Sequence, residues 1–211
     1  MTTQAAPSRP VRPRDAASLV VLRQRQHGTA EVLLGRRHSR HRFLPDVYVF
    51  PGGRLDRQDY RTPLRAALRP EVAARLERHW PRGKAQGLAV AAARETFEET
   101  GLAFGTVDDG RLVPHLESFD YIARAITPPD SPIRFHARFF LANAEAAQGR
   151  LRDSAELQDL RWVTLPEALR MPLIDVTEFV LQELTRRLGG WRAPGVPFFH
   201  FRQGVARVRY E

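Results

Sequence analysis

Residues 94–102 read Arg94-Glu95-Thr96-Phe97-Glu98-Glu99-Thr100-Gly101-Leu102, and this stretch decides the fold. On a helix Glu95, Glu98 and Glu99 stand at positions i, i+3 and i+4, so they share one face. Three neighbouring carboxylates repel one another unless a cation compensates them, and Mg²⁺ prefers carboxylate oxygens. The alternative is a solvated acidic face, but the helix macrodipole disfavours anions near a C-terminus. The pattern therefore favours a metal-binding helix.

The helix around this stretch is expected from about Gln86 to Thr100. Gly101 supplies a suitable C-cap. Small alanines on the opposite face would let the helix pack closely on a sheet and hold its carboxylates in place.

The flanking sequence predicts a mixture of strands and helices. Upstream, strands at Ser18–Arg23 and Glu31–Arg37 form a hairpin, and a strand at Val47–Phe50 ends at the Pro51-Gly52-Gly53 turn. Residues 57–84 have apolar positions at helical spacing, so one or two inserted helices are expected there. Downstream we expect strands at 115–126, 133–142 and 157–163, helices at 165–170 and 175–188, and a final hairpin within 196–210.

Composition narrows the class of protein. The chain has 211 residues and no cysteine, which excludes a disulfide scaffold, a thiolate metal site and a cysteine nucleophile. Lys84 is the single lysine among 33 basic residues, and the formal net charge is +9. Arginine binds phosphate bidentately, so this surface suits polyphosphates or nucleic acid, although a G+C-rich genome would also produce such a composition.

The chain also lacks targeting features. No run approaches the ~18 apolar residues of a membrane span, and the first residues lack the apolar core of a secretory signal. We therefore expect a cytoplasmic protein without a membrane partner. Residues 1–16 are predicted to be a flexible lead-in, and residues 17–211 a single domain.

The segment from Arg94 to Leu102 resembles the second half of the Nudix box, G-x5-E-x7-R-E-U-x-E-E-x-G-U, where U is aliphatic. Every fixed letter of that half matches, and Thr96 departs at the first U. Gly53 matches the box glycine, and counting back from Arg94 places Gln86 at the first glutamate. On this alignment about 27 extra residues split the box. The resemblance implies an α/β/α sandwich with a mixed, curved sheet and a helical insertion inside the box.

The resemblance also implies a divalent-metal-dependent hydrolase that cleaves a nucleoside diphosphate linked to another moiety. Glu98 and Glu99 would bind Mg²⁺ or Mn²⁺, with Glu95 as a further ligand and a backbone carbonyl at Gly52 or Gly53 completing the coordination. Arg94 would pair with a box glutamate and hold it in position. The general base stays open between a box glutamate and three further candidates, which are Glu156, His115 and His136.

A second motif resembles the signature of coenzyme A-active Nudix enzymes, L-L-T-x-R-[SA]-x3-R-x3-G-x3-F-P-G-G. The matching positions are Leu33, Leu34, Arg37, Arg42 and Phe50-Pro51-Gly52-Gly53, whereas Gly35, His38 and Asp46 depart. The resemblance is to acyl-coenzyme A diphosphatases of the peroxisomal mammalian type and their bacterial relatives. It implies that CoA or acyl-CoA is cleaved to 3′,5′-ADP and acyl phosphopantetheine. Arg37, Arg42, Gly52 and Gly53 would then contact substrate.

The sequence leaves other functions open. The substrate could be another nucleotide diphosphate such as ADP-ribose, NADH or a nucleoside triphosphate. A non-catalytic nucleotide- or RNA-binding module is disfavoured, because all three glutamates are present and no aromatic–basic stacking pattern occurs. The insertion, which contains Trp80, could form a lid, a pocket for pantetheine or a homodimer surface.

Overall fold

The computed structural model describes residues 11–25, 28–38, 45–78, 80–81 and 84–211. Its strands are β1 (Arg14–Gln24), β2 (Ala30–Arg37), β3 (Tyr48–Val49), β4 (Gly52–Arg54), β5 (Leu102–Ala103), β6 (Gly105–Asp108), β7 (Arg111–Pro114), β8 (Asp120–Ile126), β9 (Phe135–Asn143), β10 (Gln148–Gly149), β11 (Leu157–Thr164), β12 (Pro197–Arg202) and β13 (Val205–Tyr210). Its helices are the 3-10 turns η1 (Arg57–Tyr60) and η2 (Ala144–Ala146) and the α-helices α1 (Pro70–Glu77), α2 (Ala85–Thr100), α3 (Leu165–Ala168) and α4 (Asp175–Leu188).

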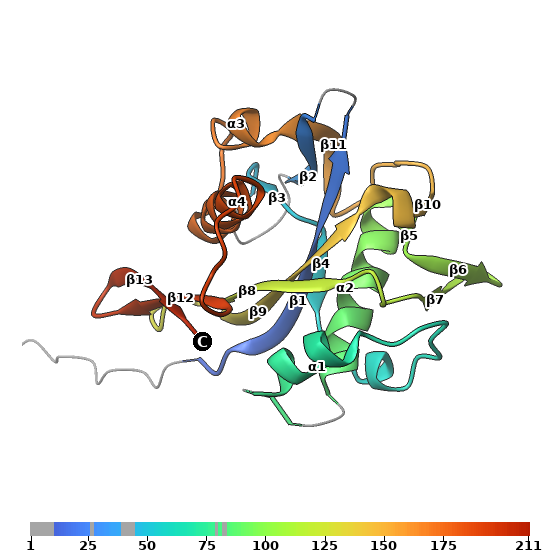
Figure 1. Cartoon of the computed structure of the whole chain (residues 1–211), viewed down its shortest axis with the longest axis horizontal. Coiled ribbons are helices and arrows are strands. Elements are labelled where there is room, and N and C mark those ends of the chain that lie inside the picture. The colour runs from blue at the N-terminus through green and yellow to red at the C-terminus, as the bar shows by residue number, and fades with distance from the viewer. Residues whose placement is uncertain (1–10, 26–27, 39–44, 79, 82–83) are drawn as a thin grey trace, which may run out of the picture.

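A mixed sheet forms the centre of the molecule (Figure 1). Its order is β11-β2-β1-β9-β8-β12-β13, with β3 added to β2 and β4 added to β1. The β1–β9 and β8–β12 pairs are parallel, and the other pairs are antiparallel. The predicted β1–β2 hairpin and the final β12–β13 hairpin are both confirmed. Since β1 begins at Arg14, the paired structure starts inside the segment expected to be a flexible lead-in.

Helices cover both faces of the sheet, and the side chains of β1 alternate between them. Leu19 and Val21 pack on the side of α1 and α2, whereas Val20 and Leu22 pack on the side of α3 and α4. Two hydrophobic cores therefore flank one sheet. Figure 1 shows the helices that cover its two faces. The α/β/α sandwich predicted from the sequence is confirmed.

The helix α2 packs closely on β1 and β4 because its inner face consists mainly of alanine. It ends at Gly101, whose φ of 77° is left-handed and whose amide donates to the Phe97 carbonyl at 2.9 Å. Thr96 is fully buried, and its hydroxyl donates to the Ala92 carbonyl at 2.7 Å. A threonine at this aliphatic position of the motif is thus satisfied within its own helix.

The predicted insertion contains η1, α1 and a connecting stretch between them. The amide of Leu68 in that stretch donates to Oε1 of Gln86 at 3.1 Å. Trp80 stacks on the guanidinium of Arg138, whose carbon lies 4.4 Å from the ring centroid. The insertion is therefore bound to both α2 and β9.

The strand predicted over residues 115–126 is too long, because β8 begins only at Asp120. The preceding residues pair with the insertion instead, as the amide of Leu116 donates to the Ala66 carbonyl at 2.9 Å. Short strands such as β4 and β5 were not expected. No helix of the described residues is long and apolar enough to cross a membrane.

Candidate active site

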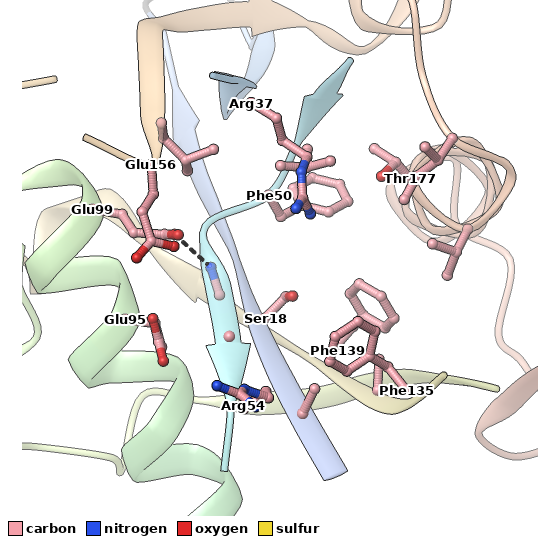
Figure 2. Close-up of a pocket in the computed structure, with 18 of the residues that line it drawn as sticks. Ser18, Arg37, Phe50, Arg54, Glu95, Glu99, Phe135, Phe139, Glu156 and Thr177 are labelled. Carbon is pink, nitrogen blue, oxygen red and sulfur yellow. Dashed lines mark hydrogen bonds between the residues drawn. The ribbon is translucent and has the colours of Figure 1, made fainter. Parts of the chain in front are cut away.

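A cavity of about 390 Å³ opens beside β4, at the end of α2 that carries the glutamates. Its acidic lining residues are Asp56, Glu95, Glu99 and Glu156, and its arginines are Arg37 and Arg54. In Figure 2 the three labelled glutamates lie on one side of β4, and Phe50, Phe135, Phe139 and Thr177 lie on the other side. We refer to this cavity as the carboxylate pocket.

Glu99 is the most deeply buried carboxylate of this pocket, with 6% of its surface exposed. Its Oε2 accepts a hydrogen bond of 2.8 Å from the Gly52 amide, drawn as a dashed line in Figure 2. Burial raises the pKa of Glu99 to about 8, and the charges of Glu95 and Glu156 act in the same direction against the opposing effects of the Gly52 bond and Arg37. A cation bound beside Glu99 would offset this burial cost and favour its ionised form.

Glu95 lies against the backbone of β4. A Cβ atom added to Gly53 would overlap the Glu95 carboxylate, so only glycine allows this approach. Burial raises the pKa of Glu95, and the nearby Glu98 and Glu156 carboxylates act in the same direction, whereas Arg94 lowers it. Gly53, which the sequence predicts as part of the site, therefore allows the Glu95 carboxylate to lie directly against β4.

Arg94 forms the centre of an ion-pair network under the pocket. Its Nε lies 2.8 Å from Asp59, and its Nη1 lies 2.9 Å from Glu95 and 3.1 Å from Glu98. Burial by itself would lower the pKa of Arg94, but Asp59 and Glu95 raise it above its ordinary value. The expected role of Arg94, to hold a box glutamate in position, agrees with this geometry.

Asp59 corrects the alignment of the first box glutamate. Its side chain is fully buried, and it lies in η1 with five residues between it and Gly53. This is the G-x5-E spacing with aspartate in place of glutamate. Gln86 instead binds the Leu68 amide, away from the carboxylates. The extra residues therefore follow Asp59, and the assignment to Gln86 was wrong; the intact spacing from Gly53 was the signal that could have found Asp59.

Not every predicted residue lines the pocket. The Glu98 side chain is 54% exposed, pairs with Arg94 and is absent from the pocket lining within the described residues. Arg37 lines the pocket, and burial lowers its pKa against the opposing effect of Glu99 and Glu156. Arg42 lies outside the described residues. Arg54, which the sequence did not single out, lines the pocket beside the glycine turn.

The candidates for the general base differ in whether they line the carboxylate pocket. Glu156 lines the pocket from the segment just before β11, facing the two α2 glutamates. His115 lies 3.3 Å from Glu117 on the surface, and His136 lies 3.9 Å from Asp15. Neither histidine is among the residues that line the pocket in the described part of the chain. Glu156 and the box glutamates therefore remain candidates for the general base, and the two histidines do not.

The opposite side of the pocket is apolar. It is formed by Phe50 just after β3, by Phe135 and Phe139 of β9, and by Ile174 and Val176 at the start of α4. The Phe50 and Phe139 rings meet edge to face with centroids 6.4 Å apart. The alternating aromatics of β9 look like core positions in the sequence, so their contribution to a pocket could not be separated from packing.

The carboxylates of the pocket are suitable ligands for a hard divalent cation, although they do not lie close to one another. Within the described residues no three acidic or histidine side chains are grouped closely enough to hold a metal ion. Glu95 and Glu99 nevertheless share one pocket with Glu156, and burial first and the neighbouring carboxylates second raise the pKa of both, effects that a bound cation would offset. Carboxylate oxygens with no nitrogen or sulfur ligand nearby are the donors that Mg²⁺ and Mn²⁺ prefer.

Comparison with known proteins identifies the family. A family model described as the NUDIX domain matches residues 79–186, just over half of the chain. The chain therefore belongs to the Nudix family, and it is a pyrophosphohydrolase that acts on nucleoside diphosphate derivatives. Members of this family generally use divalent metals. A search of curated proteins found no match.

Solved structures agree with this assignment. A NUDIX hydrolase from Alicyclobacillus acidocaldarius is 27% identical with a TM-score of 0.64, and the match covers 81% of this chain and 90% of that one. The NUDIX domain of Shewanella oneidensis NrtR, solved with ADP ribose, is 18% identical with a TM-score of 0.52, covering 89% and 99%. A MutT NUDIX hydrolase from Burkholderia pseudomallei is 21% identical with a TM-score of 0.51, covering 82% and 99%. The last two show a shared fold.

Proposed function

We propose that this chain hydrolyses the diphosphate of CoA or acyl-CoA with Mg²⁺ or Mn²⁺, releasing 3′,5′-ADP and acyl phosphopantetheine. The observation that carries the proposal is one pocket with carboxylates, including the buried Glu99, on one side and phenylalanines on the other. A diphosphate linked to an apolar group matches both sides. The signature residues Arg37 and Phe50-Pro51-Gly52-Gly53 support the CoA assignment, because all five line or border this pocket.

Glu95 and Glu99 would hold the metal with Glu98 and the Gly53 carbonyl. When bound, the divalent ion neutralises the diphosphate and acidifies a water molecule. Glu98 must leave its contact with Arg94 to join this set, and its exposed side chain has room to rotate toward the pocket. The Gly52 amide holds Glu99 in place, and Asp59 with Arg94 holds Glu95.

Two arginines would bind the phosphates. Arg37 approaches from β2 and Arg54 from β4, on either side of the glycine turn. A guanidinium binds phosphate oxygens bidentately, so the two residues would orient the diphosphate between them. Arg42 would add a further contact if the family signature holds. Glu156 would accept the proton of the attacking water, because it lines the pocket without belonging to the helix α2 that would hold the metal.

The departure from the signature at Gly35 has a packing reason. A Cβ atom at this position would lie 2.8 Å from Leu160 and 3.2 Å from Leu157, so the threonine of the signature would require these β11 side chains to move. Gly35 is not among the residues that line the pocket in the described part of the chain. The departure is therefore compatible with CoA as the substrate.

ADP-ribose is the second candidate. The NrtR domain that shares this fold was solved with ADP ribose, and the phenylalanine side of the pocket could equally stack an adenine ring. The apolar lining alone does not separate the two, because pantetheine carries amide and hydroxyl groups that need hydrogen-bond partners as adenine does. The signature residues Arg37 and Phe50-Pro51-Gly52-Gly53 are what favour CoA over ADP-ribose.

A substrate panel tests the proposal. Purified protein is incubated with CoA, acetyl-CoA, a long-chain acyl-CoA, ADP-ribose, NADH and dNTPs, each with Mg²⁺, Mn²⁺ or EDTA. We expect metal-dependent release of 3′,5′-ADP from the CoA compounds, and its loss in Glu98→Gln and Glu99→Gln. Preferential cleavage of ADP-ribose would keep the metal site and overturn the CoA assignment. Cleavage that persists in EDTA would overturn the metal site.

A further inference from the structure

A second cavity, of about 430 Å³, lies where α1 approaches the chain that follows α4. Its lining consists of Arg75, Arg78, Arg187, Trp191, Arg192, Ala193, Pro194, Gly195 and Glu211. It shares no lining residue with the carboxylate pocket. Thr177 and Arg187 line different cavities from the same helix, and their ten-residue separation corresponds to roughly 15 Å of helix. We refer to this second cavity as the arginine cavity.

The arginine cavity is strongly basic. Arg75 and Arg78 come from α1 and its C-cap, Arg187 from the last turn of α4, and Arg192 from the following loop. Arg78 and Arg192 are exposed, and the other two are half-buried. No salt bridge joins any of the four to a carboxylate among the residues that the structure describes. Four guanidinium groups thus share one cavity, and none of the four forms a salt bridge with a carboxylate of the described residues.

The neighbouring carboxylates are engaged elsewhere. Glu211 lines the cavity, but its side chain lies 2.8 Å from Arg124 and 2.6 Å from Arg209. Glu183 lies 3.1 Å from Arg186 and accepts a hydrogen bond from Tyr210. These acids are already compensated, so an external anion would meet a net positive cavity.

Among the four cavity arginines, Arg187 is the one with a buried nitrogen that lacks a partner in the described part of the chain. One Nη donates to the Ile122 carbonyl at 3.1 Å, but its Nε is buried and has no hydrogen-bond partner among the described residues. Burial lowers the pKa of Arg187, and the positive charge of Arg75 acts in the same direction against the opposing effect of Glu183. The α4 dipole favours a cation at this end of the helix, but it does not explain the additional arginines from α1 and the loop.

An indole ring completes the cavity. Trp191 is 38% exposed, and its ring meets Tyr210 edge to face with centroids 5.5 Å apart. Exposed tryptophan offers a flat surface on which a nucleobase can stack. Guanidinium groups bind phosphate oxygens bidentately. We propose that the arginine cavity binds a nucleoside phosphate, with the phosphate on its arginines and the base on Trp191.

Calorimetric titration of the full chain with AMP tests this site. EDTA is present so that metal-dependent binding in the carboxylate pocket is removed. The Arg78→Ala/Arg192→Ala double variant removes two exposed charges, so its fold should persist, which an unchanged melting temperature would verify. We expect AMP affinity to fall at least tenfold in the double variant, because two charge-assisted phosphate contacts are lost. Arg111→Ala/Arg207→Ala, which removes two exposed arginines from β7 and β13, is the matched control and should bind AMP like the wild type.

Two further titrations test the parts of the ligand. Trp191→Ala should weaken AMP binding and leave inorganic phosphate binding unchanged, because only the base contacts the indole. AMP affinity that is equal in the wild type and the double variant would overturn the site, as would the absence of AMP binding. Inorganic phosphate that binds as tightly as AMP would overturn the nucleoside part. A single-stranded oligonucleotide that binds far more tightly than AMP, and that the double variant and the surface control weaken equally, would indicate a general basic surface and overturn the site.

Discussion

Replacing Asp59 with alanine should destabilise the protein and disable its active site together. The Asp59 side chain is fully buried, and that of Arg94 is 16% exposed, so their 2.8 Å ion pair is shielded from water. Removing one partner of a buried pair leaves an uncompensated charge and typically costs about 3–5 kcal/mol. Asp59 also accepts a hydrogen bond of 2.8 Å from the Asp56 amide, which the substitution breaks as well. We expect a loss of about 3 kcal/mol in the free energy of unfolding.

Activity should fall for a separate reason. Without Asp59 the guanidinium of Arg94 keeps only Glu95 and Glu98 as acidic partners among the described residues. It would then bind these two carboxylates more tightly and withhold them from a metal. The apparent affinity for Mg²⁺ in hydrolysis should weaken at least tenfold. Urea denaturation and Mg²⁺ titrations of the reaction rate measure the two effects.

Matched variants make this reasoning refutable. Asp108→Ala removes an exposed carboxylate 4.0 Å from Arg65 and should change stability by less than about 0.5 kcal/mol. Gln86→Glu should not rescue Asp59→Ala, because residue 86 binds the Leu68 amide rather than Arg94. Rescue by Gln86→Glu, or a stability loss below about 1 kcal/mol in Asp59→Ala, would refute the assignment of Asp59 as the first acidic residue of the box.

Three further outcomes follow from the carboxylate pocket. Gly53→Ala should displace Glu95 and lower kcat/KM by at least tenfold in a hydrolysis assay. Gly189→Ala, where an added Cβ would meet only ordinary contacts at 3.4 and 3.5 Å, should leave kcat/KM unchanged; equal activities would contradict the close approach. The pKa of Glu99 is raised from 4.5 to about 8, so its contribution to the stability of the metal-free protein is fully present below pH 4.5 and is lost as pH rises through 8. Because Mg²⁺ binds the ionised carboxylate, Mg²⁺ should raise the melting temperature more at pH 8.5 than at pH 6.5. The same pH dependence in Glu99→Gln would assign the effect to another group. Glu156→Gln should lower kcat by about 100-fold with little change in Mn²⁺ affinity if Glu156 accepts the proton, and parallel losses of both would make it a metal ligand instead.

The sequence predicted the parts of the fold whose patterns are long and regular. The helix bearing Glu95 and Glu99 was placed to within one residue, because its alanine face and Gly101 mark both packing and termination. The strands β1 and β2 and the final hairpin were also recognised, since each has a clear turn signal. The two-residue strands β3, β5 and β10 carry too few side chains for any periodicity. These residues form strands only because another strand pairs with them in the folded protein.

The site was predicted less completely than the helix that carries it. Asp59 was missed because counting back from Arg94 crosses the insertion, whereas counting forward from Gly53 does not. The apolar side of the pocket was missed because Phe135 and Phe139 have the spacing of core residues in a strand. Whether such a side chain faces the core or a cavity depends on which element packs against its strand. For Phe135 and Phe139 that element is the start of α4.

The most direct test of the central claim is the metal dependence of hydrolysis in Glu99→Gln. Substituting glutamine keeps an acceptor for the Gly52 amide, so the fold around β4 should persist while the charge is lost. Wild type and variant are compared for Mn²⁺ binding by electron paramagnetic resonance and for release of 3′,5′-ADP from CoA. We expect Glu99→Gln to bind Mn²⁺ at least tenfold more weakly and to lower kcat/KM by about 100-fold. Wild-type hydrolysis in excess EDTA, or an unchanged rate in Glu99→Gln, would contradict the role of Glu99 as a metal ligand.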